Sequence, residues 1–364
     1  MFSGIEGRPL EGGASGPDRV LMLAPFRRQQ RGNAITVERL YRGLLEQGYR
    51  VEVEALEDET CWARIARALE QNRYRFVHGF NAYYISEAFK RVPQLAGWPL
   101  LLTTTGTDLH YGLRGPKTRE LRDIIVKAAY TVVFNPQFKT LLEFVPDFEN
   151  RVVSIPQGVW LETAESWQRR QLDLADNDTV FILPSGLRPV KNLDLAIAGL
   201  ALIKPELPDL KLLIVGAAID HGYAESFLAK VADWPWVLYL GEIPHRQMAS
   251  LYLLGDVVVN SSLAEGQPQA ALEAMSLGRP ALLSAVPGNL GIMEHGRQGY
   301  YFASPEQLAE YALELAKSPE KRLIMGASAR DLTSRCFSLT AEVDAYKHLY
   351  GIMFKQRKGY CENC

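Results

Sequence analysis

Two cations stand close together in the stretch Ser185–Asn192, between an apolar run and a helical pattern. Gly186 permits a tight turn there, and Asn192 could cap the helix that follows. The free N–H groups and the dipole of a helix N-terminus attract anions, and Arg188 and Lys191 add positive charge. Arg188 offers a planar fork and Lys191 a point charge, so a diphosphate would fit here. The alternative is a solvated basic turn.

Two carboxylates follow the apolar run Asp256–Asn260: Glu265 lies in its loop, and Glu273 comes eight residues later, inside the next helix. Pro268 suits the first position of that helix, and Gly278 suits its C-cap. Carboxylates in these places could accept hydrogen bonds from the vicinal hydroxyls of a sugar. Main-chain amides at the helix start could also meet a ligand oxygen: those of Gly266, Gln267 and Gln269. The alternative for Glu273 is the helix surface, since Glu is a good helix former.

These side chains need strands and helices to position them. The sequence predicts such elements, because short apolar runs alternate with helical patterns in two stretches of the chain. In the first stretch we expect strands at Arg19–Pro25, Val51–Ala55, Phe76–His78, Pro99–Thr104, Tyr130–Phe134 and Val152–Ile155, and helices at Ala34–Gln47, Trp62–Gln71, Ser86–Val92 and Lys117–Ala128. In the second we expect strands at Thr179–Leu183, Lys211–Val215, Val237–Leu240, Asp256–Asn260 and Ala281–Ser284, and helices at Asn192–Ile203, Tyr223–Ala232, His245–Leu254, Pro268–Leu277 and Pro305–Lys317. Two or three helices close the chain between Pro319 and Lys355.

This alternation predicts parallel sheets with helices on both faces. The expected class is therefore α/β, with two doubly wound Rossmann-like domains facing across a cleft. Ligands in such sheets bind outside the carboxyl ends of the strands. We expect a flexible lead-in at 1–18, domains at 19–160 and 161–338, and a C-terminal helix with a tail at 339–364. The polar stretch Trp160–Asn177 marks the linker between the domains.

The composition of the 364 residues narrows the class of protein. The chain has 40 Lys and Arg residues and 42 Asp and Glu residues. The resulting net charge of −2 argues against a protein that coats nucleic acid or anionic membrane by its overall charge. No apolar run approaches the ~20 residues of a membrane span, and the N-terminus lacks the pattern of a signal peptide. Four cysteines make no disulfide framework. We expect a soluble cytoplasmic protein with no nucleic-acid partner; peripheral membrane contact and the oligomeric state stay open.

Two motifs of the chain resemble glycosyltransferase family 4, the glycosyl transferases group 1, which has the GT-B fold: Ser185-Gly-Leu-Arg-Pro-Val-Lys191 and Glu265-Gly-Gln-Pro-Gln-Ala-Ala-Leu-Glu273. Gly241-Glu-Ile-Pro244 and Ile155-Pro-Gln-Gly-Val159 are also similar to elements of that family. Three further segments fall in the family's order of cleft elements: Gly32-Asn33, Thr105-Gly-Thr-Asp108 and Pro287-Gly-Asn289. The resemblance covers residues 19–350 and is greatest to a small branch containing glycosyltransferase 1 domain-containing proteins and selenosugar synthases.

The resemblance implies that a nucleotide sugar, with UDP as the expected nucleotide, binds the second domain. Arg188 and Lys191 would neutralise the diphosphate, Glu265 would face the donor sugar, and Glu273 would hold the ribose hydroxyls. Catalysis would fall to Arg188, Lys191 and Glu265. The full set of implied donor-binding residues is Gly186, Arg188, Lys191, Gly241, Glu265, Gly266, Gln267, Pro268, Gln269 and Glu273.

The resemblance also implies retention of anomeric configuration, with attack from the face of departure and no covalent intermediate. The nucleotide sugar is a co-substrate, so we expect no cofactor, and we expect no metal because the six histidines lack metal-site spacing. The first domain would bind the acceptor, and the C-terminal helix would cross back onto it. The implied acceptor or cleft residues are Gly32, Asn33, His78, Thr107, Asp108 and Asn289.

Several readings stay open. His78 could be a structural histidine and Asp108 a turn cap. Arg27, Arg28 and Arg31 could bind an anionic acceptor or form a solvated basic loop. The chain departs from the family at three positions: Thr105 replaces a frequent His, Gln267 a hydrophobic residue and Gly291 a Glu. Cys361 and Cys364 predict a disordered tail.

Three other functions compete with sugar transfer to an unidentified acceptor. The first is the transfer of sugar to selenophosphate, as in selenosugar synthases. The second is a nucleotide-sugar epimerase or hydrolase, which would need a general acid and base from among His78, Asp108 and Glu265. The third is a non-catalytic protein that binds nucleotide sugars, which the intact cation pair disfavours.

Overall fold

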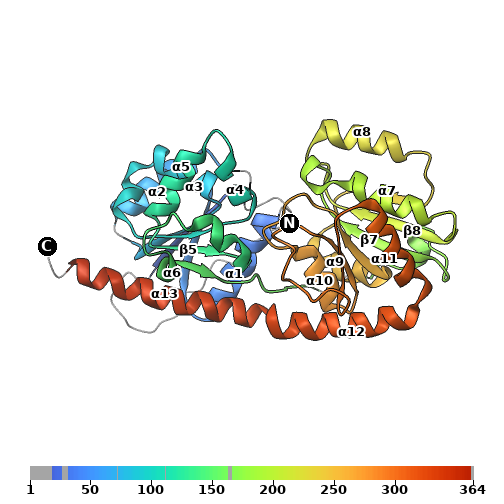
Figure 1. Cartoon of the computed structure of the whole chain (residues 1–364). Helices are drawn as coiled ribbons and strands as arrows, with labels where there is room; N and C mark the ends of the chain where they lie inside the picture. The colour runs from blue at the N-terminus through green and yellow to red at the C-terminus, as the bar shows by residue number, and fades with distance from the viewer. Residues whose placement is uncertain (1–18, 27–31, 72, 111, 163–165, 362–364) are drawn as a thin grey trace.

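The computed structural model describes residues 19–361, apart from 27–31, 72, 111 and 163–165. The chain forms two α/β units that lie side by side, each with its own sheet (Figure 1). The lead-in, the basic loop Arg27–Arg31 and Cys364 fall outside the described residues.

The first sheet has six parallel strands in the order β2-β1-β3-β4-β5-β6. Its strands are β1 (Arg19–Ala24), β2 (Arg50–Ala55), β3 (Phe76–Phe80), β4 (Leu100–Thr103), β5 (Tyr130–Val133) and β6 (Val152–Ser154). Its helices are α1 (Gly32–Glu46), α2 (Cys61–Glu70), α3 (Ala82–Arg91), α4 (Thr107–His110), α5 (Thr118–Lys127) and α6 (Phe148–Arg151).

The second sheet also has six parallel strands, in the order β12-β11-β10-β7-β8-β9. Its strands are β7 (Thr179–Pro184), β8 (Leu210–Val215), β9 (Val237–Tyr239), β10 (Val257–Asn260), β11 (Ala281–Ser284) and β12 (Gly299–Phe302). The helices from this part of the chain onward are α7 (Leu193–Ile203), α8 (His221–Val231), α9 (His245–Leu254), α10 (Gln269–Ser276), α11 (Pro305–Lys317), α12 (Pro319–Cys336) and α13 (Leu339–Cys361).

Both sheets are buried on their two faces, as parallel sheets require. In β7, Phe181 packs with one core cluster and Ile182 with another, because successive side chains point to opposite faces. Leu21 and Met22 of β1 divide in the same way between the two clusters of the first unit. The prediction of an α/β fold with two doubly wound units is confirmed.

Some elements differ from the sequence prediction. The strand β12 was not expected, since Gly-Tyr-Tyr-Phe lacks an aliphatic run, yet it pairs with β11 along its whole length. Helix α3 begins at Ala82 rather than Ser86 because the side chain of Asn81 caps it by accepting from the Tyr83 N–H. Asn192 is the N-cap residue of α7, as predicted, but its φ is 46° and its side chain makes no capping bond.

The last two helices run along one side of both units (Figure 1). α12 packs on α10, and α13 lies against α1 of the first unit, where Tyr346 and Tyr350 are fully buried. At the crossing point Glu342 forms an ion pair with Arg39, 2.7 Å apart, and both side chains are 1% exposed. Among the described residues, no helix has the length and apolarity needed to cross a bilayer.

Candidate functional site

A cavity of 740 Å³ lies between the two units, at the ends of the strands where the sequence predicted a cleft. The first unit lines it with Gly32, Thr36, Asn81, Tyr84, Thr105 and Thr107. The second unit contributes Gly186, Arg188, Lys191, His245, Glu265 and Glu273. Gly266, Gln267, Pro268 and Gln269 also reach the wall. The structure thus brings the predicted cations and both carboxylates to one cavity.

Lys191 and Glu265 form the charged centre of the second unit's wall. The Lys191 Nζ lies 2.5 Å from Glu265 Oε1, with side chains 17% and 10% exposed. The same oxygen accepts from Ser262 Oγ at 2.6 Å and Asn260 Nδ2 at 2.9 Å. Burial alone would raise the pKa of Glu265, but the Lys191 charge and these hydrogen bonds outweigh it and lower the pKa. Glu265 is therefore an ionised acceptor for hydrogen bonds at neutral pH.

Glu273 lies deep in the cavity wall, 4% exposed, so its alternative place on a helix surface is wrong. Its Oε2 accepts from Tyr252 Oη at 2.9 Å, and its Oε1 lies 3.0 Å from His245 Nε2. Burial alone would lower the pKa of His245, but the Glu273 carboxylate outweighs it and raises the pKa. The His245 ring also stacks on Trp160, with centroids 5.6 Å apart.

His78 is not in the cavity. Its side chain is fully buried beneath α13, and its ring nitrogens contact Tyr350 Oη and Thr103 Oγ1, each at 2.8 Å. Burial lowers the pKa of His78 to about 3, so the ring is neutral. The structural reading of this histidine is the correct one, because both nitrogens already have partners inside the core.

Asp108 caps a turn rather than facing the cavity. Its carboxylate accepts from the main-chain N–H groups of Ala82 at 2.8 Å, Thr105 at 3.0 Å and Leu109 at 3.2 Å. Burial raises the pKa of Asp108, although these N–H donors partly oppose the rise. The residue holds the Thr105–Thr107 turn, whose two threonines line the cavity.

Gly241 and Asn289 also lie away from the cavity wall. Gly241 has φ of +70°, and its carbonyl accepts from the Gly216 N–H at 2.8 Å. Its neighbour Glu242 lines the cavity instead. Asn289 is fully buried and donates to Asn260 Oδ1 at 3.1 Å. Gly32 does line the cavity; Asn33 belongs to α1, and its side chain is not among those described.

Gln267 and Gln269 bind the segment that joins the two units. Gln267 Nε2 donates to the Gln157 carbonyl at 2.9 Å, and Gln267 Oε1 accepts from the Gln157 N–H at 3.0 Å. Gln269 Nε2 donates to the Gly158 carbonyl at 2.8 Å. The Gln269 N–H is bonded to the Gln267 carbonyl at 2.9 Å, so the expectation that this amide is open to a ligand is wrong.

Several site residues escaped the sequence analysis. His245 and Tyr252 hold Glu273, and Asn260 and Ser262 hold Glu265. The available signals were the position of Asn260 at a strand end and that of His245 directly after the Gly241-Glu-Ile-Pro244 turn. No group of three His, Cys, Asp or Glu side chains suited to a metal is present in the part of the chain that the structure describes.

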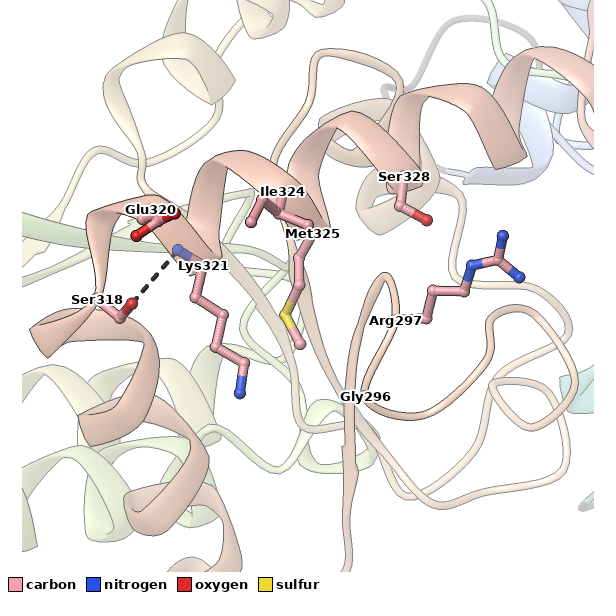
Figure 2. Close-up of a pocket in the computed structure, with 8 residues that line it drawn as sticks. All are labelled: Gly296, Arg297, Ser318, Glu320, Lys321, Ile324, Met325 and Ser328. Atoms are coloured by element: carbon pink, nitrogen blue, oxygen red, sulfur yellow. Dashed lines mark hydrogen bonds between the residues drawn. The ribbon is translucent and has the colours of Figure 1, made fainter.

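A second hollow, of 570 Å³, lies beside α12 (Figure 2). Arg297 and Lys321 flank it, and the side chain of Met325 lies between them in that view. The Ser318 hydroxyl accepts from the Lys321 N–H at 3.3 Å there, which caps α12. None of the predicted site residues lines this hollow.

Two doubly wound sheets with a cavity between them are the arrangement of the GT-B fold, and solved structures confirm the match. The Anabaena protein HepE in complex with UDP-glucose superposes with a TM-score of 0.76, at 18% identity, over 92% of this chain and 99% of that chain. Sucrose-phosphate synthase from Thermosynechococcus elongatus superposes with a TM-score of 0.78, at 17% identity, over 93% of this chain and 100% of that chain.

Residues 165–332 match the family model of the glycosyl transferases group 1. Glycosyltransferase 1 domain-containing protein 1 of Xenopus tropicalis is 25% identical over 345 residues, which are 91% of this chain and 97% of that protein. N-acetyl-alpha-D-glucosaminyl L-malate synthase of Bacillus anthracis is 24% identical over 289 residues, 76% and 72% of the two chains. The predicted resemblance to this family is confirmed, and it supports sugar transfer as the type of reaction.

Proposed function

We propose that this protein is a retaining glycosyltransferase that takes a sugar from a UDP-sugar donor. The observation that carries the proposal is the convergence of Arg188, Lys191, Glu265 and Glu273 on one cavity. The HepE structures are complexes with UDP and with UDP-glucose, which supports the choice of nucleotide. Residues 161–338 would bind the donor and residues 19–160 the acceptor.

The cations would act on the leaving group. As the bond from the anomeric carbon to the diphosphate oxygen breaks, negative charge grows on that oxygen, and fixed positive charges beside it lower the barrier. Arg188 and Lys191 border the same cavity, so both could approach one diphosphate. The acceptor oxygen would bond to the anomeric carbon on the face of departure, and its proton would pass to the departing phosphate. No protein base is needed in this scheme.

The carboxylates would orient the donor. Glu273 contacts His245 and Tyr252, and its carboxyl oxygens could also accept from the ribose hydroxyls. Glu265 is held by Lys191 and could accept from a hydroxyl of the sugar. An epimerase or hydrolase is disfavoured, because two of its three acid and base candidates, His78 and Asp108, are buried outside the cavity.

Turnover of UDP-glucose followed by proton NMR tests the proposal. We expect UDP release with the α-anomer of the sugar, or an α-linked product, formed first. Arg188→Ala and Glu265→Gln should lower the rate at least a hundredfold. Arg297→Ala, which removes an exposed arginine at the other hollow, should not change the rate. A β-configured first product would contradict retention. Acceptor candidates are then compared in the same assay, with selenophosphate among them.

A further inference from the structure

One asparagine of the first unit contacts the main chain of the second. Asn135 follows β5 and is 2% exposed. Its Nδ2 donates to the carbonyl oxygens of Leu290 at 2.9 Å, Pro287 at 3.2 Å and Gly288 at 3.3 Å. Its Oδ1 accepts from the Gln137 N–H at 3.0 Å. That bond fixes the orientation of the amide, so the nitrogen faces the second unit.

The segment Pro287–Leu290 reaches Glu265 by two routes. Its Asn289 Nδ2 donates to Asn260 Oδ1 at 3.1 Å, which leaves Asn260 Nδ2 to donate to Glu265 Oε1 at 2.9 Å. In addition, Gly288 packs directly on the main chain of Glu265, where any side chain on Gly288 would overlap it. A shift of this segment would therefore change both the position and the hydrogen bonding of Glu265.

The first unit also contacts the other side of the Glu265 loop. Gly106 has φ of +95°, and a Cβ on it would overlap the main chain of Gly266, while a Cβ on Gly266 would overlap the carbonyl of Thr105. The main chain after Glu265 is thus held by the Thr105–Thr107 turn, while the side chain is held through the segment next to Asn135. Both contacts exist only while the two units lie together.

We propose that Asn135 is a positioning residue for Glu265, which makes the hydrogen bonding of that carboxylate depend on domain closure. With the units together, Asn135 holds the Pro287–Leu290 segment. Asn289 and the Ser262 N–H both donate to Asn260 Oδ1, and Asn260 Nδ2 donates to Glu265. When the units separate, the three bonds from Asn135 are lost, and the segment is left with its bonds within the second unit, among them Asn289 Nδ2 to the Ser284 carbonyl at 2.9 Å. The inference rests on the proposed role of Glu265 toward the donor sugar.

Two variants of Asn135 test the inference. Asn135→Asp keeps the size and the acceptor for Gln137 N–H, but places a carboxylate against three carbonyl oxygens. Asn135→Ser keeps a side-chain oxygen that can accept from the Gln137 N–H, but is too short to reach the second unit. Asn150→Ser, at an exposed asparagine of the same unit, is the matched control. Its side chain donates to Asp147 at the start of α6.

The readouts are UDP-glucose hydrolysis across pH and X-ray scattering of the free protein. We expect kcat to fall at least fivefold in Asn135→Ser and at least tenfold in Asn135→Asp, with the donor KM within twofold of wild type. The acid limb of the pH profile should move to higher pH, because Glu265 loses support for its charged form. The radius of gyration should rise in both variants and stay unchanged in Asn150→Ser.

The outcomes separate this inference from the proposed function. If the wild type turns over UDP-glucose and both Asn135 variants keep its kcat and pH profile, the inference is wrong while the function stands. If the wild type does not turn over the donor, the function fails, and scattering alone decides the inference. Scattering curves identical in wild type and both variants would then overturn it.

Discussion

The buried ion pair between Arg39 and Glu342 joins the C-terminal helix to the first unit, and its removal should strongly destabilise the protein. The two side chains meet through Nε at 2.7 Å and Nη2 at 2.9 Å, and Glu342 also accepts from the Gly158 N–H at 2.9 Å. Glu342→Ala leaves a guanidinium with almost no access to water. Breaking such a pair costs about 3–5 kcal/mol.

The assay is equilibrium unfolding in urea, with the midpoint of thermal unfolding as a second measurement. Each kcal/mol shifts the midpoint by about 2–4 °C in domains of 150–250 residues, so a drop of roughly 6–20 °C is expected. Glu38→Ala is the matched control. Glu38 pairs with Arg42 on the same helix, α1, at 2.6 Å, but with side chains 34% and 45% exposed. Loss of the exposed Glu38–Arg42 pair should lower the free energy of unfolding by less than about 1 kcal/mol.

A double variant refines the test. Arg39→Met with Glu342→Leu removes both charges and should recover most of the stability, since apolar side chains can replace a buried pair. If Glu342→Ala and Glu38→Ala both lower the free energy of unfolding by the same small amount, burial does not make the Arg39 pair costly to break.

The other predictions concern the site and the core. Tyr252→Phe removes one hydrogen bond to the buried Glu273 carboxylate, so UDP should bind about fivefold more weakly by calorimetry, a change of about 1 kcal/mol; unchanged affinity would exclude a role for that bond. The pKa of His78 is lowered to about 3 from 6.5, so below pH 6.5 the unfolded state binds a proton that the native state does not. Stability should therefore fall below pH 6.5 with a slope that approaches about 1.4 kcal/mol per pH unit near pH 5, and His78→Asn should lack this contribution in urea titrations at each pH. Gln267→Leu leaves the buried N–H and carbonyl of Gln157 without these partners and should cost about 1–3 kcal/mol in urea unfolding, whereas a wild-type midpoint would show that the bonds contribute nothing.

The sequence predicted the fold well because buried parallel strands are almost wholly apolar. The run Thr179–Leu183 could be recognised without knowledge of its neighbours. β12 was missed because Gly299–Phe302 owes its place to pairing with β11, where a Cβ on Gly299 would overlap Ala281. A close approach between two strands leaves no recognisable pattern in the amino-acid sequence.

The candidate site was predicted in part, for a related reason. Loops after strands meet at one edge of a sheet, so Lys191, Glu265 and Glu273 could be expected together. The direction of a side chain at a strand end could not be foreseen. His78 points beneath α13, a helix more than 250 residues later in the chain, and its two nitrogens are used there. Asn135 was missed because its three bonds join parts of the chain that only the fold brings together.

In the proposed function, the second unit binds a nucleoside diphosphate through Arg188, Lys191 and Glu273. Calorimetric titration of UDP into wild type, Arg188→Ala, Glu273→Gln and Arg297→Ala tests it most directly. We expect saturable binding at one site in wild type and in Arg297→Ala, with affinity at least tenfold lower in Arg188→Ala and Glu273→Gln. Absence of UDP binding in wild type, or equal affinity in all four proteins, would contradict it.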